Sequence, residues 1–143
     1  MVTIAAGASV YLDTNALIYI TEGSAAFKAS MEGLLREALA VKATLVTSEL
    51  ALTEVLVAPM RDRNRALLDA YSELFDAFVK AVPVERAILM RAAQLRADTI
   101  RLRTPDAIHL ATAQFVGAAL FVTGDARISV SSPMVRRLLR PDG

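Results

Sequence analysis

Short apolar segments alternate with longer amphipathic segments along the sequence, and this alternation constrains the fold more than any other feature. The short segments are rich in β-branched or large apolar residues, as expected for strands buried on both faces of a parallel sheet. Alternating strands and helices predict an α/β domain whose parallel strands are joined by right-handed connections. The predicted strands are Val10–Leu12, Thr44–Val46, Phe78–Val82 and Leu120–Thr123, with a further short strand near Ile128–Val130.

Capping and helix-breaking residues mark the helical segments between these strands. We expect Ser24, Ser48 and Thr104 to cap helices, since their hydroxyls can accept the free N–H groups of a first turn. Pro59 is expected to end a helix, and Pro105 to occupy a first helical position, where a missing N–H costs nothing. The predicted helices are Asn15–Tyr19, Ser24 to about Val41, Glu49–Val57, Arg65–Phe75, Glu85–Asp98 and one that opens at Thr104.

The composition excludes several kinds of active site. The chain has 143 residues, so we expect a single domain over residues 1–143, and its 55% hydrophobic content argues against disorder. It contains no cysteine, which excludes disulfides, thiolate catalysis and cysteine-based zinc sites. Its one histidine, His109, excludes both a histidine-rich zinc site and a ribonuclease mechanism that needs two imidazoles.

One long uncharged stretch, residues 107–124, approaches the length of a membrane span. His109, Thr112 and Gln114 interrupt it, and the spacing changes from helix-like to strand-like near Gly117. The N-terminus has no basic region before Val10 and no plausible cleavage site, so no signal peptide is predicted. We therefore expect a cytoplasmic protein with no membrane segment.

Four carboxylates lie at junctions between the predicted elements. Asp13 ends the first strand, and Asp125 follows the fourth strand after one glycine. Asp106 lies in a first helical turn, and Glu54 interrupts a mostly apolar helix. Ligands of open parallel sheets bind beyond the carboxyl ends of the strands, so these acids are expected to converge there. Desolvation and mutual repulsion disfavour such a cluster unless a divalent cation neutralises it.

Each acid also has an ordinary explanation. Asp13 could form a local turn, Asp125 could belong to turn chemistry after a glycine, and Asp106 is favoured by the dipole of its own helix. Glu54 could form an internal ion pair with an arginine, but its apolar neighbours at helical spacing make it a better ligand candidate than Glu49 of the same helix. The combination of the four acids is therefore the informative signal.

Carboxylate oxygens favour Mg²⁺ or Mn²⁺, and a water activated by such a metal can attack a phosphodiester. We expect Asp13, Asp106 and Asp125 to bind the metal, with all four acids catalytic. The neighbouring polar residues that could orient ligands or water are Thr14, Asn15 and Thr123.

Arginines dominate the basic residues of the distal part of the chain. From residue 101 onward there are six arginines against three acids, and arginine suits bidentate phosphate contacts. Arg101 and Arg103, just before Asp106, are the expected contacts to the phosphates that flank the cut, and a second candidate is the basic loop of Arg61, Arg63 and Arg65. His109 follows Asp106 by one helical turn, and we assign it a packing or supporting role.

Four stretches of the sequence together resemble the PIN-domain nucleases, in order, spacing and local context. They cover nearly the whole chain, and within that family the compact form resembles the VapC-type toxins of bacterial toxin–antitoxin pairs. This sequence departs from the family pattern at Gly124, where many relatives have a polar residue before the last acid. The stretches are Val10–Leu17, Thr47–Leu56, Thr104–Ala113 and Phe121–Asp125.

This resemblance implies a three-layer domain with a five-stranded parallel sheet in the order 3-2-1-4-5. It also implies an endoribonuclease that depends on Mg²⁺ or Mn²⁺, with the acids of the family carried over onto Asp13, Glu54, Asp106 and Asp125. A homodimer and a cognate antitoxin, whose tail occupies the active-site groove, are further implications.

Other functions are compatible with parts of the pattern. A phosphoacceptor receiver domain would need a lysine near the last strands, and there is none after Lys80. A phosphatase of the haloacid-dehalogenase type would need an aspartate where Asn15 stands. A PIN nuclease outside toxin–antitoxin systems, and a PIN-fold module that binds RNA without cutting it, both remain open until activity is measured.

Overall fold

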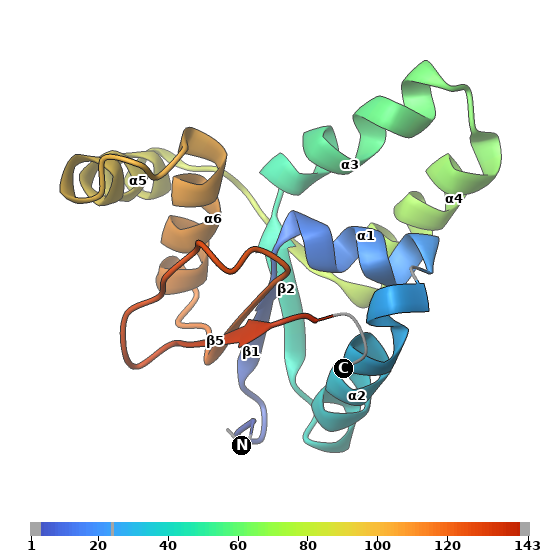
Figure 1. Cartoon of the computed structure of the whole chain (residues 1–143), viewed down its shortest axis with the longest axis horizontal. Coiled ribbons are helices and arrows are strands. Elements are labelled where there is room, and N and C mark those ends of the chain that lie inside the picture. The colour runs from blue at the N-terminus through green and yellow to red at the C-terminus, as the bar shows by residue number, and fades with distance from the viewer. Residues whose placement is uncertain (1–3, 24, 141–143) are drawn as a thin grey trace.

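The computed structural model describes residues 4–23 and 25–140. Its parallel sheet has five strands in the order β3-β2-β1-β4-β5, and helices cover both faces (Figure 1). The predicted fold class and strand order are therefore confirmed. The elements are β1 Ser9–Leu12, α1 Thr14–Glu22, the 3₁₀ turn η1 Ala25–Phe27, α2 Lys28–Ala40, β2 Thr44–Ser48, α3 Leu50–Arg61, α4 Arg65–Glu73, the π-helical turn η2 Leu74–Phe78, β3 Lys80–Val82, α5 Arg86–Asp98, α6 Thr104–Phe115, β4 Leu120–Thr123 and β5 Val135–Leu138.

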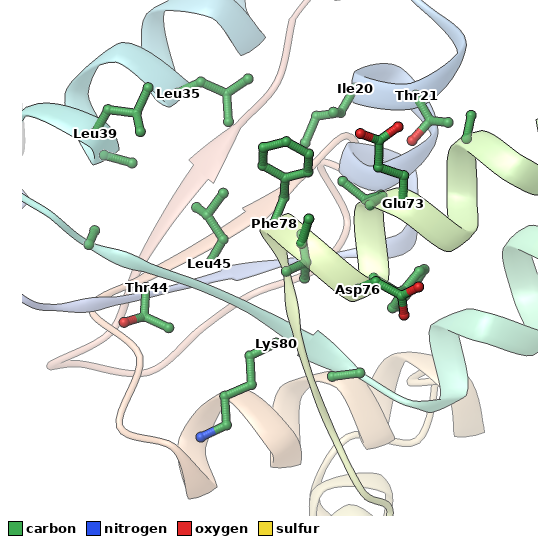
Figure 2. Close-up of a pocket in the computed structure, with 18 residues that line it drawn as sticks. Ile20, Thr21, Leu35, Leu39, Thr44, Leu45, Glu73, Asp76, Phe78 and Lys80 are labelled. Atoms are coloured by element: carbon green, nitrogen blue, oxygen red, sulfur yellow. The ribbon is translucent and has the colours of Figure 1, made fainter.

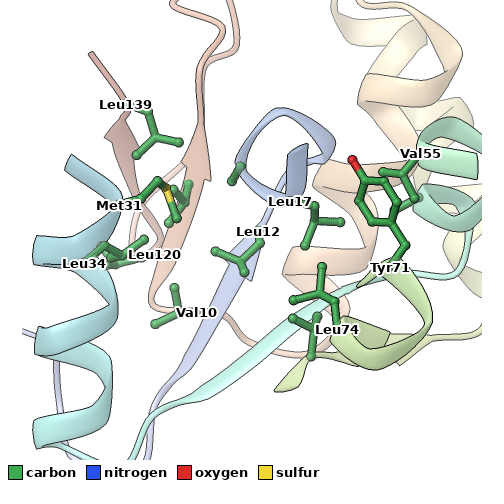
Figure 3. Packing of buried hydrophobic residues seen from close by; sticks show 14 of the residues in the cluster. Val10, Leu12, Leu17, Met31, Leu34, Val55, Tyr71, Leu74, Leu120 and Leu139 are labelled. Carbon is green, nitrogen blue, oxygen red and sulfur yellow. The ribbon is translucent and has the colours of Figure 1, made fainter. Parts of the chain in front are cut away.

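The central strands divide their side chains between two cores because successive residues of a strand point to opposite faces. Val10 and Leu12 pack with helices α1 to α4, and Figure 3 shows this core around Leu17 and Tyr71. Tyr11, between Val10 and Leu12, faces the other core, which α6 covers. Helix α5 packs on α6 and completes that outer layer. The result is a three-layer domain with the sheet in the middle.

The final strand lies where the sequence did not place it. We expected a strand near Ile128–Val130, but that segment is irregular and β5 is Val135–Leu138. Ile128 is nevertheless 4% exposed, since it packs against the core under α6. An apolar segment that is buried without being paired to a strand accounts for the wrong prediction.

Several helix boundaries also differ from expectation. Pro59 does not end α3 but lies buried inside it, three residues after Leu56, and the helix continues to Arg61. Thr104 lies inside α6, where Arg103 is the N-cap residue, although Pro105 does occupy the first turn as predicted.

Further differences affect the ends of single elements. Helix α1 is longer than predicted, and the third strand starts at Lys80 because Phe78 belongs to η2. Ser48 accepts a hydrogen bond from the N–H of Leu50, although Glu49 is the residue in the N-cap position of α3. The predicted cap at Ser24 lies outside the described residues. Within the described part of the chain, no helix combines the length and the apolar character that crossing a bilayer requires.

Candidate active site

Asp13 connects the central strand to the helix that follows it. Its Oδ1 accepts the backbone N–H of Thr14 at 2.8 Å and so caps α1, the local turn role that the sequence left open. Its Oδ2 accepts the hydroxyl of Thr123 at 2.8 Å, from the end of the neighbouring strand β4. The parallel pairing of β1 with β4 brings these two strand ends together, and the N–H of Asp13 bonds to the carbonyl of Val122. Two strand ends therefore hold one carboxylate in a fixed position.

Burial of this carboxylate raises its pKa. Asp13 is 5% exposed, and desolvation outweighs the hydrogen bonds from Thr123 and Thr14, which act in the opposite direction. The negative charge of Asp106 raises the pKa of Asp13 further, so the two carboxylates lie close enough to repel each other. A cation near Asp13 would relieve both costs.

Glu54 and Asp13 have the same two neighbours, Thr14 and His109. The hydroxyl of Thr14 donates to Oε1 of Glu54 at 2.9 Å, and Nε2 of His109 lies 2.6 Å from the same oxygen. The other ring nitrogen of His109, Nδ1, lies 2.6 Å from the hydroxyl of Tyr11. Nε2 of His109 is also 3.9 Å from Oδ1 of Asp13. Helices α3 and α6 and strand β1 thus contribute to one polar cluster between them.

The hydrogen bonds of this cluster keep Glu54 ionised. Burial is the largest single influence and would raise the pKa of Glu54, but the interactions with His109, Thr14 and Arg103 together outweigh it and hold that pKa below its ordinary value. The partner is a histidine and not the arginine that the alternative explanation required. Glu49, by contrast, is exposed at the start of α3, outside this cluster.

Asp106 and Asp125 each form an ion pair with an arginine. Nε of Arg103 lies 3.2 Å from Oδ2 of Asp106, and the guanidinium of Arg127 contacts both oxygens of Asp125 at 3.0 and 2.9 Å. The hydrogen bond from Arg127 lowers the pKa of Asp125. Oδ1 of Asp125 also accepts the N–H of Arg127, which is the turn chemistry that the sequence left open. Both acids and both arginines, with Arg101, line a cavity of about 590 Å³.

The donor chemistry of these acids suits Mg²⁺ or Mn²⁺, because the oxygens are carboxylates and one of them is buried. The expected convergence is nevertheless incomplete. In the described ranges, 4–23 and 25–140, no three His, Asp or Glu side chains come close enough together to hold a metal ion in this conformation. Arg103 and Arg127 are 68% and 81% exposed, so both can rotate away from Asp106 and Asp125 without loss of packing.

Comparison with known families identifies this arrangement. The sequence model of the PIN domain family matches residues 10–130, which include all four acids. The chain belongs to the PIN domain family. Domains of this family are generally nucleases. A search of curated proteins found no match.

Solved structures similar to this PIN domain include three assemblies. A toxin–antitoxin complex from Klebsiella pneumoniae has 24% identity, covers 88% of this chain and 94% of its own, and gives a TM-score of 0.59. VapBC2 from Rickettsia felis, bound to a DNA fragment from its promoter, has 15% identity, coverages of 92% and 98%, and a TM-score of 0.66. FitAcB from Neisseria gonorrhoeae has 15% identity, coverages of 81% and 87%, and a TM-score of 0.61. At these identities the likeness establishes the fold.

Close packing explains the glycine before the last acid of this PIN domain. A Cβ atom at position 124 would lie 3.0 Å from the hydroxyl of Tyr19 and 3.5 Å from Cβ of Asn15. Tyr19 cannot move aside easily, because its ring stacks on Phe27 with centroids 4.0 Å apart. Helix α1 therefore packs against the backbone just before Asp125, and Asn15 of this helix lies at the contact.

Two residues of the site were not predicted. Tyr11 has no polar neighbour in sequence that suggests a role, although strand alternation places it on the same side of β1 as Asp13. Arg127 follows Asp125 by two residues in a turn, and no local pattern favours it over Arg101 or Arg103. The loop arginines Arg61, Arg63 and Arg65 do not line the acidic cavity.

A second and larger cavity, of about 1050 Å³, lies elsewhere on the PIN domain. Figure 2 shows Leu39 from α2, Leu45 from β2 and Phe78 at the end of η2 around it. Leu39 and Phe78 are 79% and 64% exposed. Among the described residues, the linings of the two cavities have no member in common.

Proposed function

We propose that this PIN domain is a metal-dependent endoribonuclease that acts in the cytoplasm as the toxin of a toxin–antitoxin pair. One observation carries the proposal. Asp13 is a buried carboxylate fixed by two strand ends, and it feels the charge of Asp106, which lines a cavity together with Asp125 and three arginines. Acids at the carboxyl edge of a parallel sheet, beside exposed guanidiniums, suit binding and hydrolysis of a phosphodiester. The family match supports the same reaction class.

Each residue has a distinct part in the proposed reaction. Asp13, Asp106 and Asp125 would hold Mg²⁺ or Mn²⁺, which supplies charge neutralisation and an activated water when bound. Glu54 is kept ionised by its hydrogen bonds and is suited to accept a proton from the attacking water. The hydroxyl of Thr123 holds the carboxylate of Asp13 by a hydrogen bond, and the hydroxyl of Thr14 holds that of Glu54 in the same way.

RNA is the proposed substrate because exposed guanidiniums surround the acidic cavity. Arg101, Arg103 and Arg127 line it, and their planar groups can contact phosphates on either side of the bond to be cut. Substrate binding also offers new partners to Arg103 and Arg127, which would release Asp106 and Asp125 to the metal. Phosphate binding and metal binding are therefore expected to support each other.

The test is to map RNA ends after expression of the wild-type chain and of Asp106→Asn. We expect new ends from the wild type only, and in vitro cleavage that requires Mg²⁺ or Mn²⁺ and stops with a chelator. Cleavage that survives both Asp106→Asn and Asp13→Asn would remove the catalytic assignment. RNA binding without cleavage under all metal conditions would instead support the alternative, a PIN-fold module that binds RNA.

A cognate antitoxin is the proposed protein partner, with its tail in the acidic groove and an apolar segment in the larger cavity of Figure 2. Exposed Leu39 and Phe78 support an apolar occupant, and Glu73 and Asp76 in the same lining favour basic residues beside it. One of the similar structures, from Klebsiella pneumoniae, is described as a toxin–antitoxin complex, which supports this class of partner.

Co-expression with the antitoxin tests this surface. Leu39→Asp and Phe78→Asp should abolish co-purification, whereas Ile100→Asp should not, because Ile100 is 92% exposed but lies outside the cavity. Equal retention of the antitoxin by all three variants would refute the surface. We also propose a homodimer, which light scattering of the purified chain would detect directly.

A further inference from the structure

A buried histidine in the candidate site has no part in the mechanism proposed above. His109 is 1% exposed and lies between a tyrosine hydroxyl and the carboxylate of Glu54, each 2.6 Å from one ring nitrogen. A histidine that only packs in a core needs no contact with a candidate catalytic acid. This position between Tyr11 and Glu54 is therefore informative.

The partners of His109 determine where its proton lies. An ionised carboxylate can only accept a hydrogen bond, so Nε2 must carry the hydrogen that points to Glu54. Tyr11 is fully buried, and a phenol keeps its proton at neutral pH, so its hydroxyl can donate to Nδ1. The hydrogen bonds therefore run from Tyr11 to His109 to Glu54, and the hydrogen of the imidazole lies on Nε2.

Rigid packing holds Tyr11, the first donor in this series of hydrogen bonds. The ring of Tyr11 stacks on Phe121 with centroids 5.2 Å apart and planes at 6°, and it contacts His109 edge-on at 5.8 Å. Both aromatic residues belong to the central strands β1 and β4. The position of the hydroxyl is therefore fixed by the middle of the sheet.

Glu54, the last residue in this series of hydrogen bonds, is held through one oxygen of its carboxylate. Oε1 of Glu54 accepts from both His109 and Thr14, whereas Oε2 receives no hydrogen bond from any residue that the structure describes. The side chain is 30% exposed, so water can reach it. Fixing Oε1 leaves Oε2 as the oxygen available to a reacting group.

We propose that His109 is a positioning residue, whose Nε2–H holds Oε1 of Glu54 so that Oε2 meets the attacking water, and that the Tyr11 hydroxyl, by donating to Nδ1, holds the imidazole in this orientation. The proposal rests on the proposed nuclease function for its kinetic consequence. The tautomer and the hydrogen bond themselves do not depend on that function.

The tautomer can be measured directly, since His109 is the only histidine of the chain. Long-range ¹H–¹⁵N correlation spectra of an untagged, metal-free sample at neutral pH report a single imidazole. We expect the Nε2–H tautomer in the wild type and also in Tyr11→Phe, because Glu54 still requires a hydrogen on Nε2. The ¹⁵N resonance of Nδ1 should shift in Tyr11→Phe, which loses the donor to that nitrogen. An Nδ1–H tautomer or an imidazolium in the wild type, or an unchanged Nδ1 resonance in Tyr11→Phe, would overturn the proposal.

Kinetics test the effect on Glu54. His109→Gln keeps a side-chain N–H at the position of Nε2, whereas His109→Leu removes it. We expect kcat for RNA cleavage to fall roughly tenfold or more in His109→Leu, with little change in KM, and to be largely restored in His109→Gln. Equal losses in the two variants, or a loss confined to KM, would refute positioning.

Tyr11→Phe covers the case in which His109→Leu does not fold, because it removes one hydroxyl and keeps the ring. Its matched control is Tyr71→Phe, which removes the hydroxyl of another buried tyrosine, one that donates to the carboxylate of Glu22 at 2.6 Å. Reduced kcat in Tyr11→Phe with normal kcat in Tyr71→Phe supports the proposal, and equal kcat in both contradicts it. If the wild type cleaves no RNA, the nuclease function fails, and the spectra still decide the hydrogen-bond arrangement.

Discussion

Removing the hydroxyl of Thr123 should destabilise the fold by an amount that depends on the charge of Asp13. Thr123→Val keeps the shape of a fully buried side chain but deletes the O–H that bonds to Oδ2 of Asp13 at 2.8 Å. A hydrogen bond to a charged group contributes about 1.5–3 kcal/mol. The hydroxyl oxygen of Thr123 also accepts the N–H of Asp125 at 3.0 Å, and this hydrogen bond adds roughly 0.5–1.5 kcal/mol. We expect the free energy of unfolding to fall by about 2–4.5 kcal/mol at neutral pH.

Thr112→Val is the matched control for this change. Thr112 is also fully buried, but its hydroxyl donates to the carbonyl of Ile108, a neutral acceptor within α6. We expect its loss to cost about 1 kcal/mol or less. The free energies of unfolding would be measured by urea titration in chelator. Equal losses in the two valine variants would refute the claim that a charged hydrogen bond supports Asp13.

The pH dependence of this difference has a definite sign. Thr123 lowers the pKa of Asp13, so Thr123→Val raises further a pKa that burial has already raised. The variant therefore loses most stability where Asp13 is ionised, above its folded pKa. As the pH falls through that pKa the carboxyl is protonated in both proteins, and the difference between them should narrow. A difference that stays constant or widens in acid would contradict the burial argument.

Three further predictions concern the acids themselves. Because the folded pKa of Asp13 is raised, ionisation of Asp13 lowers the stability of the fold as the pH rises from the unfolded pKa near 3.8 through the folded pKa. Asp13→Asn should therefore melt at a higher temperature than the wild type at neutral pH without metal. The two melting temperatures should converge in acid, where Asp13 is protonated. Arg127→Ala should strengthen Mn²⁺ binding in calorimetry by releasing Asp125, with little change in melting temperature because the pair is exposed; weaker binding would contradict this. Glu54→Gln should reduce RNA cleavage far more than Glu49→Gln, and the reverse order would refute the assignment on α3.

The sequence was sufficient for most of the fold because its strands are short, apolar and buried on both faces. Strand β4 agrees residue for residue with the prediction, and β1 differs by one residue. The edge strand β5 has the sequence Val-Arg-Arg-Leu and is only partly buried, so it has no apolar signal. Pro59 lies near the end of α3, where a missing N–H removes one hydrogen bond and leaves the helix otherwise intact.

The sequence singled out the candidate acids, but it could not predict the contacts that the structure places around them. Position at a strand end singled out Asp13, and the residue that binds it, Thr123, also ends a strand. The hydrogen bond between Glu54 and His109 joins residues 55 apart in the chain, and no local pattern reports it. The ion pairs of Arg103 and Arg127 depend on side-chain rotamers of exposed residues, which the sequence does not determine.

Asp13 holds the architecture together with the same two oxygens that the proposed metal site would use. It closes the first turn of α1, and that helix in turn packs against Gly124 beside the last acid. Any ligand that draws charge from this carboxylate must also alter how firmly the start of α1 is tied to the sheet. Loading of the pocket should therefore be visible at a distance, as slower amide hydrogen exchange along α1.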